Sequence, residues 1–167
     1  IGQLTTEHTL SSNTALKLGL GDVVRITTAH GGGYGDPRGA IRLRAALSDY
    51  LVAERGLTAP ANGILITRGS QMGLYLAAAA LLEPGQAIAV EEPGYPLAWA
   101  AFRAAGARVL GVPVDGNGID VDRLSALADR EPDLRAVYVT PHHQYPTTVT
   151  LGAGRRLRLL ELARRTR

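Results

Sequence analysis

Four short apolar segments recur along the chain at nearly regular intervals, and this spacing constrains the fold most strongly. They begin 23, 22 and 27 residues apart and occupy residues 64–67, 87–90, 109–114 and 136–140. Helical patterns lie between them, over residues 70–82, 97–105 and 122–128. Strands that alternate with helices of this length are typical of β-α-β units on a parallel sheet. Because the strands are continuously apolar, the sheet should be covered on both faces. We therefore predict an α/β fold, in which helices flank a mostly parallel sheet.

Two further helices are expected outside this repeating pattern. Asp36 is predicted to cap the first, with Pro37 at its first position and Gly56 at its end. Its apolar stripe consists of Leu43, Leu47, Tyr50 and Leu51. The second spans about residues 154–164, and the arginines around it should form an exposed basic helix face. Residues 1–33 carry no pattern that assigns an element.

The composition of the 167-residue chain excludes several classes of site. It contains no cysteine, which rules out disulfide scaffolds, thiolate metal sites and cysteine nucleophiles. All but one of the 18 basic residues are arginine, so chemistry that needs a lysine has Lys17 as its single candidate. A net charge of +3 with 15 acidic residues favours a mixed solvated surface over a nucleic-acid footprint. No apolar run is long enough to span a membrane and no signal peptide is recognisable, so we expect a cytoplasmic protein.

A candidate phosphate site lies where the segment 64–67 turns into the following helix. Gly69, Ser70 and Gln71 stand at that turn. The backbone N–H groups at a helix N-terminus have no intrahelical partner, and the helix dipole favours a negative charge there. These three residues therefore predict a site for a phosphate at the carboxyl edge of the sheet. A serine that caps the helix without any ligand is the alternative.

The next strands end in further candidate residues at the same edge. Glu91 and Glu92 are adjacent and should point to opposite faces, which makes them a poor acid–base pair. Tyr95 follows in a turn, where its ring could cover a flat ligand or pack beneath the loop. His142 and His143 come after the fourth strand with no third ligand nearby, so a hydrogen-bonding loop is expected and a metal site is not. Since open α/β sheets bind ligands at this edge, the motifs together predict a ligand with a phosphate and a flat ring.

Several blocks of the sequence resemble fold-type I enzymes that depend on pyridoxal 5'-phosphate, the aminotransferase-like proteins. These blocks are Tyr34-x-Asp36-Pro37-x-Gly39, Thr67-x-Gly69-Ser70-Gln71, Glu92-Pro93-Gly94-Tyr95 and Thr140-Pro141-x-His143-Gln144-x-Pro146. The last block is most similar to the aminotransferase-like domain of the MocR subgroup of GntR-type transcription regulators. Ordinary aminotransferases carry an Asn-Pro pair there, whereas this chain has Tyr145-Pro146. The resemblance implies an incomplete aminotransferase-like (class I/II) domain over residues 34–167, after an unassigned segment 1–33.

The resemblance also implies roles for individual residues. Gly69, Ser70 and Gln71 would hold the cofactor's phosphate, and Tyr95 would stack on its pyridine ring. Tyr34 would reach the phosphate of a neighbouring subunit, because the active sites of this family lie at a dimer interface. His143 or Gln144 would lie near the ring hydroxyl. Thr148 stands where a glycine is common, so the loop around it is expected to differ.

Two decisive residues of the family are expected beyond residue 167, namely the acid that pairs with the pyridine nitrogen and the Schiff-base lysine. Lys17 lacks the sequence context of that lysine. The chain as given is therefore expected not to catalyse transamination. The full-length parent would be a regulator whose domain senses pyridoxal phosphate or its adduct with a small amine or amino acid, and which contacts DNA through a winged helix outside this span. An aminotransferase proper is the alternative, and a remnant that binds no cofactor is a third. An unfinished sheet predicts a homodimer or a self-associating chain, with no membrane contact.

Overall fold

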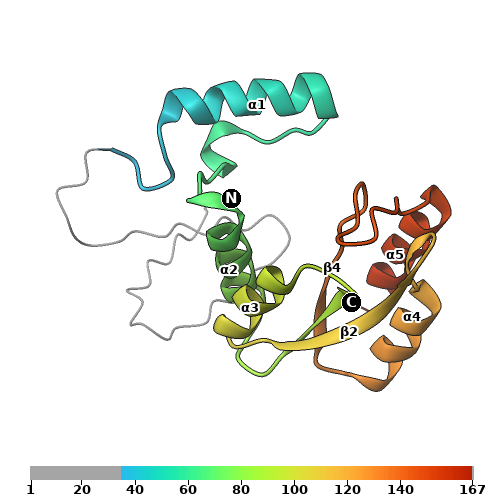
Figure 1. Cartoon of the computed structure of the whole chain (residues 1–167). Helices are drawn as coiled ribbons and strands as arrows, with labels where there is room; N and C mark the ends of the chain where they lie inside the picture. The colour runs from blue at the N-terminus through green and yellow to red at the C-terminus, as the bar shows by residue number, and fades with distance from the viewer. Residues whose placement is uncertain (1–34, 167) are drawn as a thin grey trace, which may run out of the picture.

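The computed structural model describes residues 35–166, which form one α/β unit and a helical arm (Figure 1). In chain order the elements are α1 (Ile41–Arg55), the 3-10 helix η1 (Ala61–Gly63), α2 (Gly69–Leu81), β1 (Ala87–Glu92), α3 (Pro96–Ala104), β2 (Arg108–Asp115), β3 (Gly118–Ile119), α4 (Val121–Arg130), β4 (Leu134–Tyr138) and α5 (Ala153–Arg165). Lys17 and Tyr34 lie outside the described residues, so the role expected of Tyr34 stays a prediction.

The sheet has four strands in the order β3-β2-β1-β4. β1 is central and pairs in parallel with both β2 and β4, whereas β3 pairs antiparallel with the end of β2. This confirms the predicted α/β class and its mostly parallel sheet. The short hairpin to β3 was not predicted, because a strand of two residues leaves no alternating pattern in the sequence. The chain turns at Gly116 and Asn117, and β3 then starts at Gly118, whose φ of 95° suits glycine better than residues with a Cβ.

Helices cover both faces of the sheet, as the continuously apolar strands predicted. Ile88 and Val90 of β1 pack with α2 and α3 on one face. Ala89 points the other way and packs with Val112, Leu124 and the α4–α5 layer. Burial of these side chains on both sides of one strand supplies the main favourable free energy of this unit. It also fixes the carboxyl ends of β1 and β4 side by side.

The predicted strand at 64–67 is not a strand in the structure. Its backbone N–H groups do not pair with a strand: the Ile64 N–H donates to the carbonyl of Ala61 in η1 at 3.4 Å, and the Ile66 N–H donates to the carbonyl of Arg38 at 2.9 Å. None of the described strands lies beside it, and an isolated apolar run becomes a strand only when a neighbour pairs with it. The apolar pattern therefore identified an extended segment and not a sheet member.

The first helix begins later than predicted, at Ile41, and Asp36 does not cap it. The carboxylate of Asp36 is occupied by the guanidinium groups of Arg38 and Arg44, so it is unavailable to the helix. The end of the helix at Gly56 is confirmed, with a left-handed φ of 61° at that residue. The predicted helices over 70–82, 97–105, 122–128 and 154–164 are all present as α2, α3, α4 and α5.

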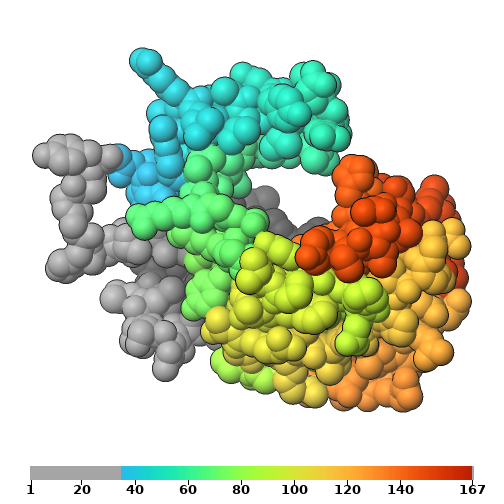
Figure 2. Space-filling model, in the orientation of Figure 1, coloured from blue at the N-terminus to red at the C-terminus, as the bar shows by residue number. Residues whose placement is uncertain are grey.

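Helix α1 stands clear of the sheet and its covering helices (Figures 1 and 2). Among the described residues it packs chiefly against η1. Several of its apolar side chains are about half exposed, namely Ile41, Leu43, Tyr50 and Val52. A helix with this much apolar surface outside a core presents a face that another surface can cover. The described helices include none that is long and apolar enough to cross a membrane.

Candidate functional site

The N-terminus of α2 presents unpaired backbone donors. Arg68 is the N-cap residue and makes no side-chain capping hydrogen bond. The Gly69 N–H donates to the Thr67 carbonyl at 3.0 Å, which leaves the N–H groups of Ser70 and Gln71 as first-turn donors without an intrahelical acceptor. The alternative of Ser70 as the cap residue is therefore wrong, because Ser70 lies inside the first turn. Gly69 has a φ of 78° and open space where a side chain would be, so an anion can approach closely.

Tyr95 lies beside this helix terminus. It occupies the N-cap position of α3, after a turn that contains a cis Glu92–Pro93 bond, and it is half-buried. The Gln71 amide nitrogen donates to the Tyr95 hydroxyl across 3.4 Å. The fold thus brings together the predicted phosphate residues and the predicted ring-covering residue, which are 24 positions apart in the sequence. A ligand that carries both a phosphate and an aromatic ring could therefore contact the α2 N-terminus and Tyr95 at the same time.

The loop after β4 is organised around Gln144, whose side chain is only 2% exposed. Its Nε2 donates to the carbonyls of Pro93 at 2.8 Å and Tyr145 at 2.6 Å. Its Oε1 accepts from the backbone N–H and the hydroxyl of Thr147. These four contacts use the full hydrogen-bonding capacity of a glutamine amide. Gln144 therefore has no donor or acceptor left for the ring hydroxyl of a ligand, whereas His143 in the same loop is exposed.

Tyr145, at the position where ordinary aminotransferases carry asparagine, meets Tyr95 through its ring. The two ring centroids are 5.7 Å apart and the rings are inclined by 73°, which is an edge-to-face arrangement. Tyr145 is otherwise about half exposed. The aromatic contact places a second ring beside the candidate ligand face and supports the first one from the side.

The two adjacent carboxylates point in different directions, as predicted. Glu91 is buried, and its Oε2 accepts from the Thr140 hydroxyl at 2.6 Å and the Thr140 N–H at 3.0 Å. Its Oε1 has no described partner. Glu92 is exposed and lies over Gly111 of β2. Burial and the nearby Glu91 carboxylate raise the pKa of Tyr138, which keeps that phenol neutral. The pair is a structural contact and an exposed acid, not an acid–base couple.

Sequence reasoning missed a charge network that ties the helical arm to the segment before α2. Arg44 is 1% exposed and donates to Asp36 at 2.6 Å, to the Gly39 carbonyl at 3.0 Å and to the Ala61 carbonyl at 2.6 Å. Hydrogen bonds from Arg38 hold the pKa of Asp36 well below its usual range. An arginine in the middle of an apolar helical stripe was the available signal. The network anchors α1 to η1, which precedes Gly69 and α2 in the chain.

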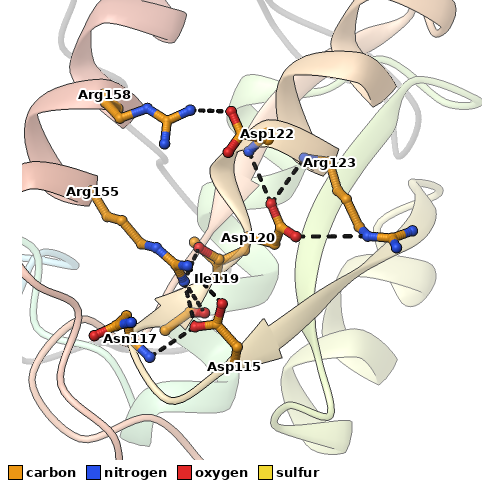
Figure 3. Close-up of polar contacts among 9 residues, drawn as sticks. Asp115, Asn117, Ile119, Asp120, Asp122, Arg123, Arg155 and Arg158 are labelled. Carbon is orange, nitrogen blue, oxygen red and sulfur yellow. Dashed lines mark hydrogen bonds and ion pairs between the residues drawn. The ribbon is translucent and has the colours of Figure 1, made fainter.

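The predicted exposure of the α5 arginines is confirmed for Arg158, Arg164 and Arg165, but several arginines of this helix are also paired with carboxylates, as Figure 3 shows for Arg155 and Arg158. Arg155 binds both carboxylate oxygens of Asp115 at 2.6 Å and also the carbonyls of Gly118 and Ile119. Arg158 pairs with Asp122 of α4, and Arg165 pairs with Asp129. The Arg155 guanidinium lowers the pKa of the Asp115 carboxyl. These arginines therefore join α5 to the β2–β3 hairpin and to α4.

The described residues thus gather Gly69, Ser70, Gln71 and Tyr95 at one edge of the sheet, with Tyr145 beside them. They fit the phosphate and one ring face of a phosphorylated aromatic cofactor, since unpaired N–H donors, open space at Gly69 and a phenol ring are all present. Within residues 35–166 there is no cluster of three or more groups that could hold a metal ion. The only lysine of the chain, Lys17, lies outside this part.

Comparison with known proteins gives matches of two kinds. The family model of class I and II aminotransferases matches residues 22–151, and so begins within the segment left unassigned from the sequence. The HTH-type transcriptional regulator TauR of Rhodobacter capsulatus is 42% identical over 114 residues, which are 68% of this chain and 22% of that protein. The probable rhizopine catabolism regulatory protein MocR of Rhizobium meliloti is 32% identical over 133 residues, 80% of this chain and 26% of that protein.

Solved aminotransferases share the fold. The crystal structure of LysN, an α-aminoadipate aminotransferase from Thermus thermophilus complexed with N-(5'-phosphopyridoxyl)-L-leucine, superposes with a TM-score of 0.70 at 33% identity. It covers 80% of this chain and 32% of that one. The chain therefore spans between about a fifth and a third of the length of these three proteins.

Proposed function

The chain belongs to the aminotransferase class I and II family, and on that premise we propose that it is part of the cofactor-binding effector domain of a MocR-type transcription regulator. The cofactor of this family is pyridoxal 5'-phosphate. The observation that carries the proposal is the α2 N-terminus, where two unpaired backbone donors lie beside Tyr95. The higher identity to a regulator and the His143-Gln144-x-Pro146 block support the regulator over the enzyme.

The residues of the chain would bind the cofactor in two parts. The N–H groups of Ser70 and Gln71 would donate to phosphate oxygens, and the Ser70 hydroxyl would add a third donor. The ring of Tyr95 would cover one face of the pyridine and exclude water from it. The Gln71 amide would hold the Tyr95 hydroxyl through the contact described above. When bound, pyridoxal phosphate supplies an aldehyde that condenses with amines and a ring that withdraws electrons.

We also propose roles for the other residues and partners that the resemblance implies. Tyr34 would approach the phosphate of a second subunit, and His143 would lie near the ring hydroxyl. Gln144 would act through the loop it holds. In the parent protein a small amine or amino acid would be the effector, and a winged helix outside this span would contact DNA. We expect no transamination from the 167-residue chain. The reaction needs a Schiff-base lysine, and the single lysine of the chain, Lys17, lacks the sequence context of that residue.

The test is a binding titration that reads the emission of Trp99, the only tryptophan of the chain. Pyridoxine 5'-phosphate serves as the ligand because it has the ring and the phosphate but no aldehyde to react with amines. Ser70→Glu places a negative charge at the proposed phosphate position and should weaken binding at least about tenfold. Ala77→Glu is the matched control, since it adds the same charge at an exposed position two turns further along α2. Equal affinities of the two variants would refute the assignment.

An aminotransferase is the second candidate for the parent, and the likeness to LysN favours it. The two candidates differ in what the full-length protein does. A regulator should bind a specific DNA site and change its affinity when pyridoxal phosphate and an amine are added. An aminotransferase should move an amino group from a donor to a keto acid at a measurable rate without affinity for DNA.

A further inference from the structure

The loops that follow β1 and β4 are joined directly to each other at the candidate site. β1 and β4 are parallel neighbours as far as the pair Val90–Tyr138, so both chains leave the sheet at the same edge. Just beyond, the buried carboxylate of Glu91 accepts two hydrogen bonds from Thr140. Two loops that start from neighbouring strands could still move independently. Here the first contact between them forms immediately after the last paired residues.

Gln144 supplies the second contact between the loops. Its Nε2 reaches the Pro93 carbonyl, two residues before Tyr95, at 2.8 Å. The same amide is held from its own loop by Tyr145 and Thr147, so the side chain is fixed at both ends. A buried amide that satisfies all its partners rigidifies what it connects, and the loss of its donors would remove the direct link to the Pro93 carbonyl. Gln144 therefore sets the position of the turn that carries Tyr95.

The rings of Tyr145 and Tyr95 make the third contact. The edge of one ring meets the face of the other, with centroids 5.7 Å apart. The Tyr95 hydroxyl also accepts a hydrogen bond from the Gln71 amide. Tyr95 is thus held between the α2 terminus and the loop after β4.

We propose that Gln144 and Tyr145 are positioning residues that orient the ring of Tyr95, and that these two residues act on a ligand through Tyr95 and not by hydrogen bonds of their own. The inference rests on the proposed function for the identity of the ligand. At the position where ordinary aminotransferases carry asparagine, Tyr145 thus gives aromatic support to Tyr95, and Gln144 beside it binds the backbone of the Tyr95 turn. This support explains why tyrosine can stand at that position.

The test separates ring binding from phosphate binding. Pyridoxine 5'-phosphate affinity is measured through Trp99, and inorganic phosphate is then titrated as a competitor. Gln144→Glu keeps the acceptor for Thr147 but removes the donors to Pro93 and Tyr145. Pyridoxine 5'-phosphate should therefore bind about tenfold more weakly to this variant. The inhibition constant of inorganic phosphate should stay unchanged. An equal loss for both ligands, or no loss for either, would overturn the proposal.

A second pair of variants guards against misfolding of the first, because Tyr145 is about half exposed. Tyr145→Phe keeps the ring edge and should retain the wild-type affinity. Tyr145→Leu removes the edge and should weaken binding about fivefold. A loss of affinity in the phenylalanine variant would show that the phenol itself contacts the ligand, which contradicts the proposal. His142→Ala, an exposed side chain in the same loop, is the control.

A readout without ligand distinguishes failure of this inference from failure of the proposed function. Gly94 packs against the indole of Trp99, so release of the Pro93–Tyr95 turn should expose that indole. Quenching of Trp99 by acrylamide should increase in Gln144→Glu and stay unchanged in His142→Ala. If the wild-type chain binds no pyridoxine 5'-phosphate, the proposed function fails, and this quenching comparison alone decides the coupling of the loops. A folded Gln144→Glu variant with unchanged quenching would overturn the coupling.

Discussion

Thr148 adopts a left-handed backbone conformation, with a φ of 63°, at the position where the resemblance expected a glycine. Its N–H donates to the Gln144 carbonyl at 2.7 Å, so the turn keeps this conformation although the residue has a branched side chain. We expected the loop around Thr148 to differ from the family because a glycine is common at this position. Thr148 instead has the left-handed backbone conformation that suits glycine. A β-branched side chain in this conformation costs free energy that glycine avoids.

Thr148→Gly should accordingly stabilise the chain. Relief of the left-handed strain is worth about 1–2 kcal/mol, and the greater freedom of glycine in the unfolded chain offsets about 0.5–1 kcal/mol of it. Urea unfolding should thus show a net gain of about 0.5–1 kcal/mol. Thr150→Gly is the control, because Thr150 has no left-handed φ and should lose stability instead. A loss of stability in both variants would show that Thr148 is not strained.

At the scale of elements, the sequence predicted correctly those helices whose formation depends on nearby residues alone. Helices α2 to α5 were found because apolar spacing and breaker residues are local properties. The segment 64–67 and the start of α1 were misjudged because each depends on a distant partner. A strand needs a neighbour, and Asp36 is taken by Arg44 from the helix it was expected to cap. In the site, the α2 terminus was recognised because helix geometry fixes it, whereas the role of Gln144 depends on Pro93, 51 residues away.

The anchoring of α1 should depend on pH through Asp36. The pKa of its carboxyl is lowered in the folded chain by Arg38 and Arg44. Its contribution is therefore complete above the ordinary aspartate pKa of about 3.9 and is lost as the pH falls below that value. Hydrogen exchange at the Gly39 and Arg44 amides should accelerate between about pH 4 and pH 2 in the wild type, after correction for intrinsic rates. In Asp36→Asn the same amides should exchange faster already at neutral pH and lack this step. If the wild type and Asp36→Asn showed the same acceleration of exchange, a carboxylate other than Asp36 would be responsible for it.

For the molecule as a whole, α1 exposes apolar side chains that the described residues do not cover. We expect this arm to take part in a homodimer, in agreement with the interface role predicted for Tyr34. Sedimentation of the wild-type chain should show concentration-dependent association. Replacement of two exposed residues by charged ones, Tyr50→Glu with Val52→Lys, should shift the chain towards monomer without a change in net charge. Ala126→Glu with Ala77→Lys, a double substitution at exposed sites outside α1, should leave association unchanged. A wild-type chain that sediments as a monomer at all concentrations would contradict the expectation.

The central claim is that the α2 terminus and Tyr95 together hold a phosphorylated aromatic cofactor. The most direct measurement compares pyridoxine 5'-phosphate with pyridoxine, which lacks the phosphate, by quenching of Trp99 emission in the same chain. The phosphate's charge-assisted hydrogen bonds to the first turn of α2 should make the phosphorylated ligand bind at least about 100-fold more tightly. Equal affinities, or no saturable binding of either ligand, would contradict the account.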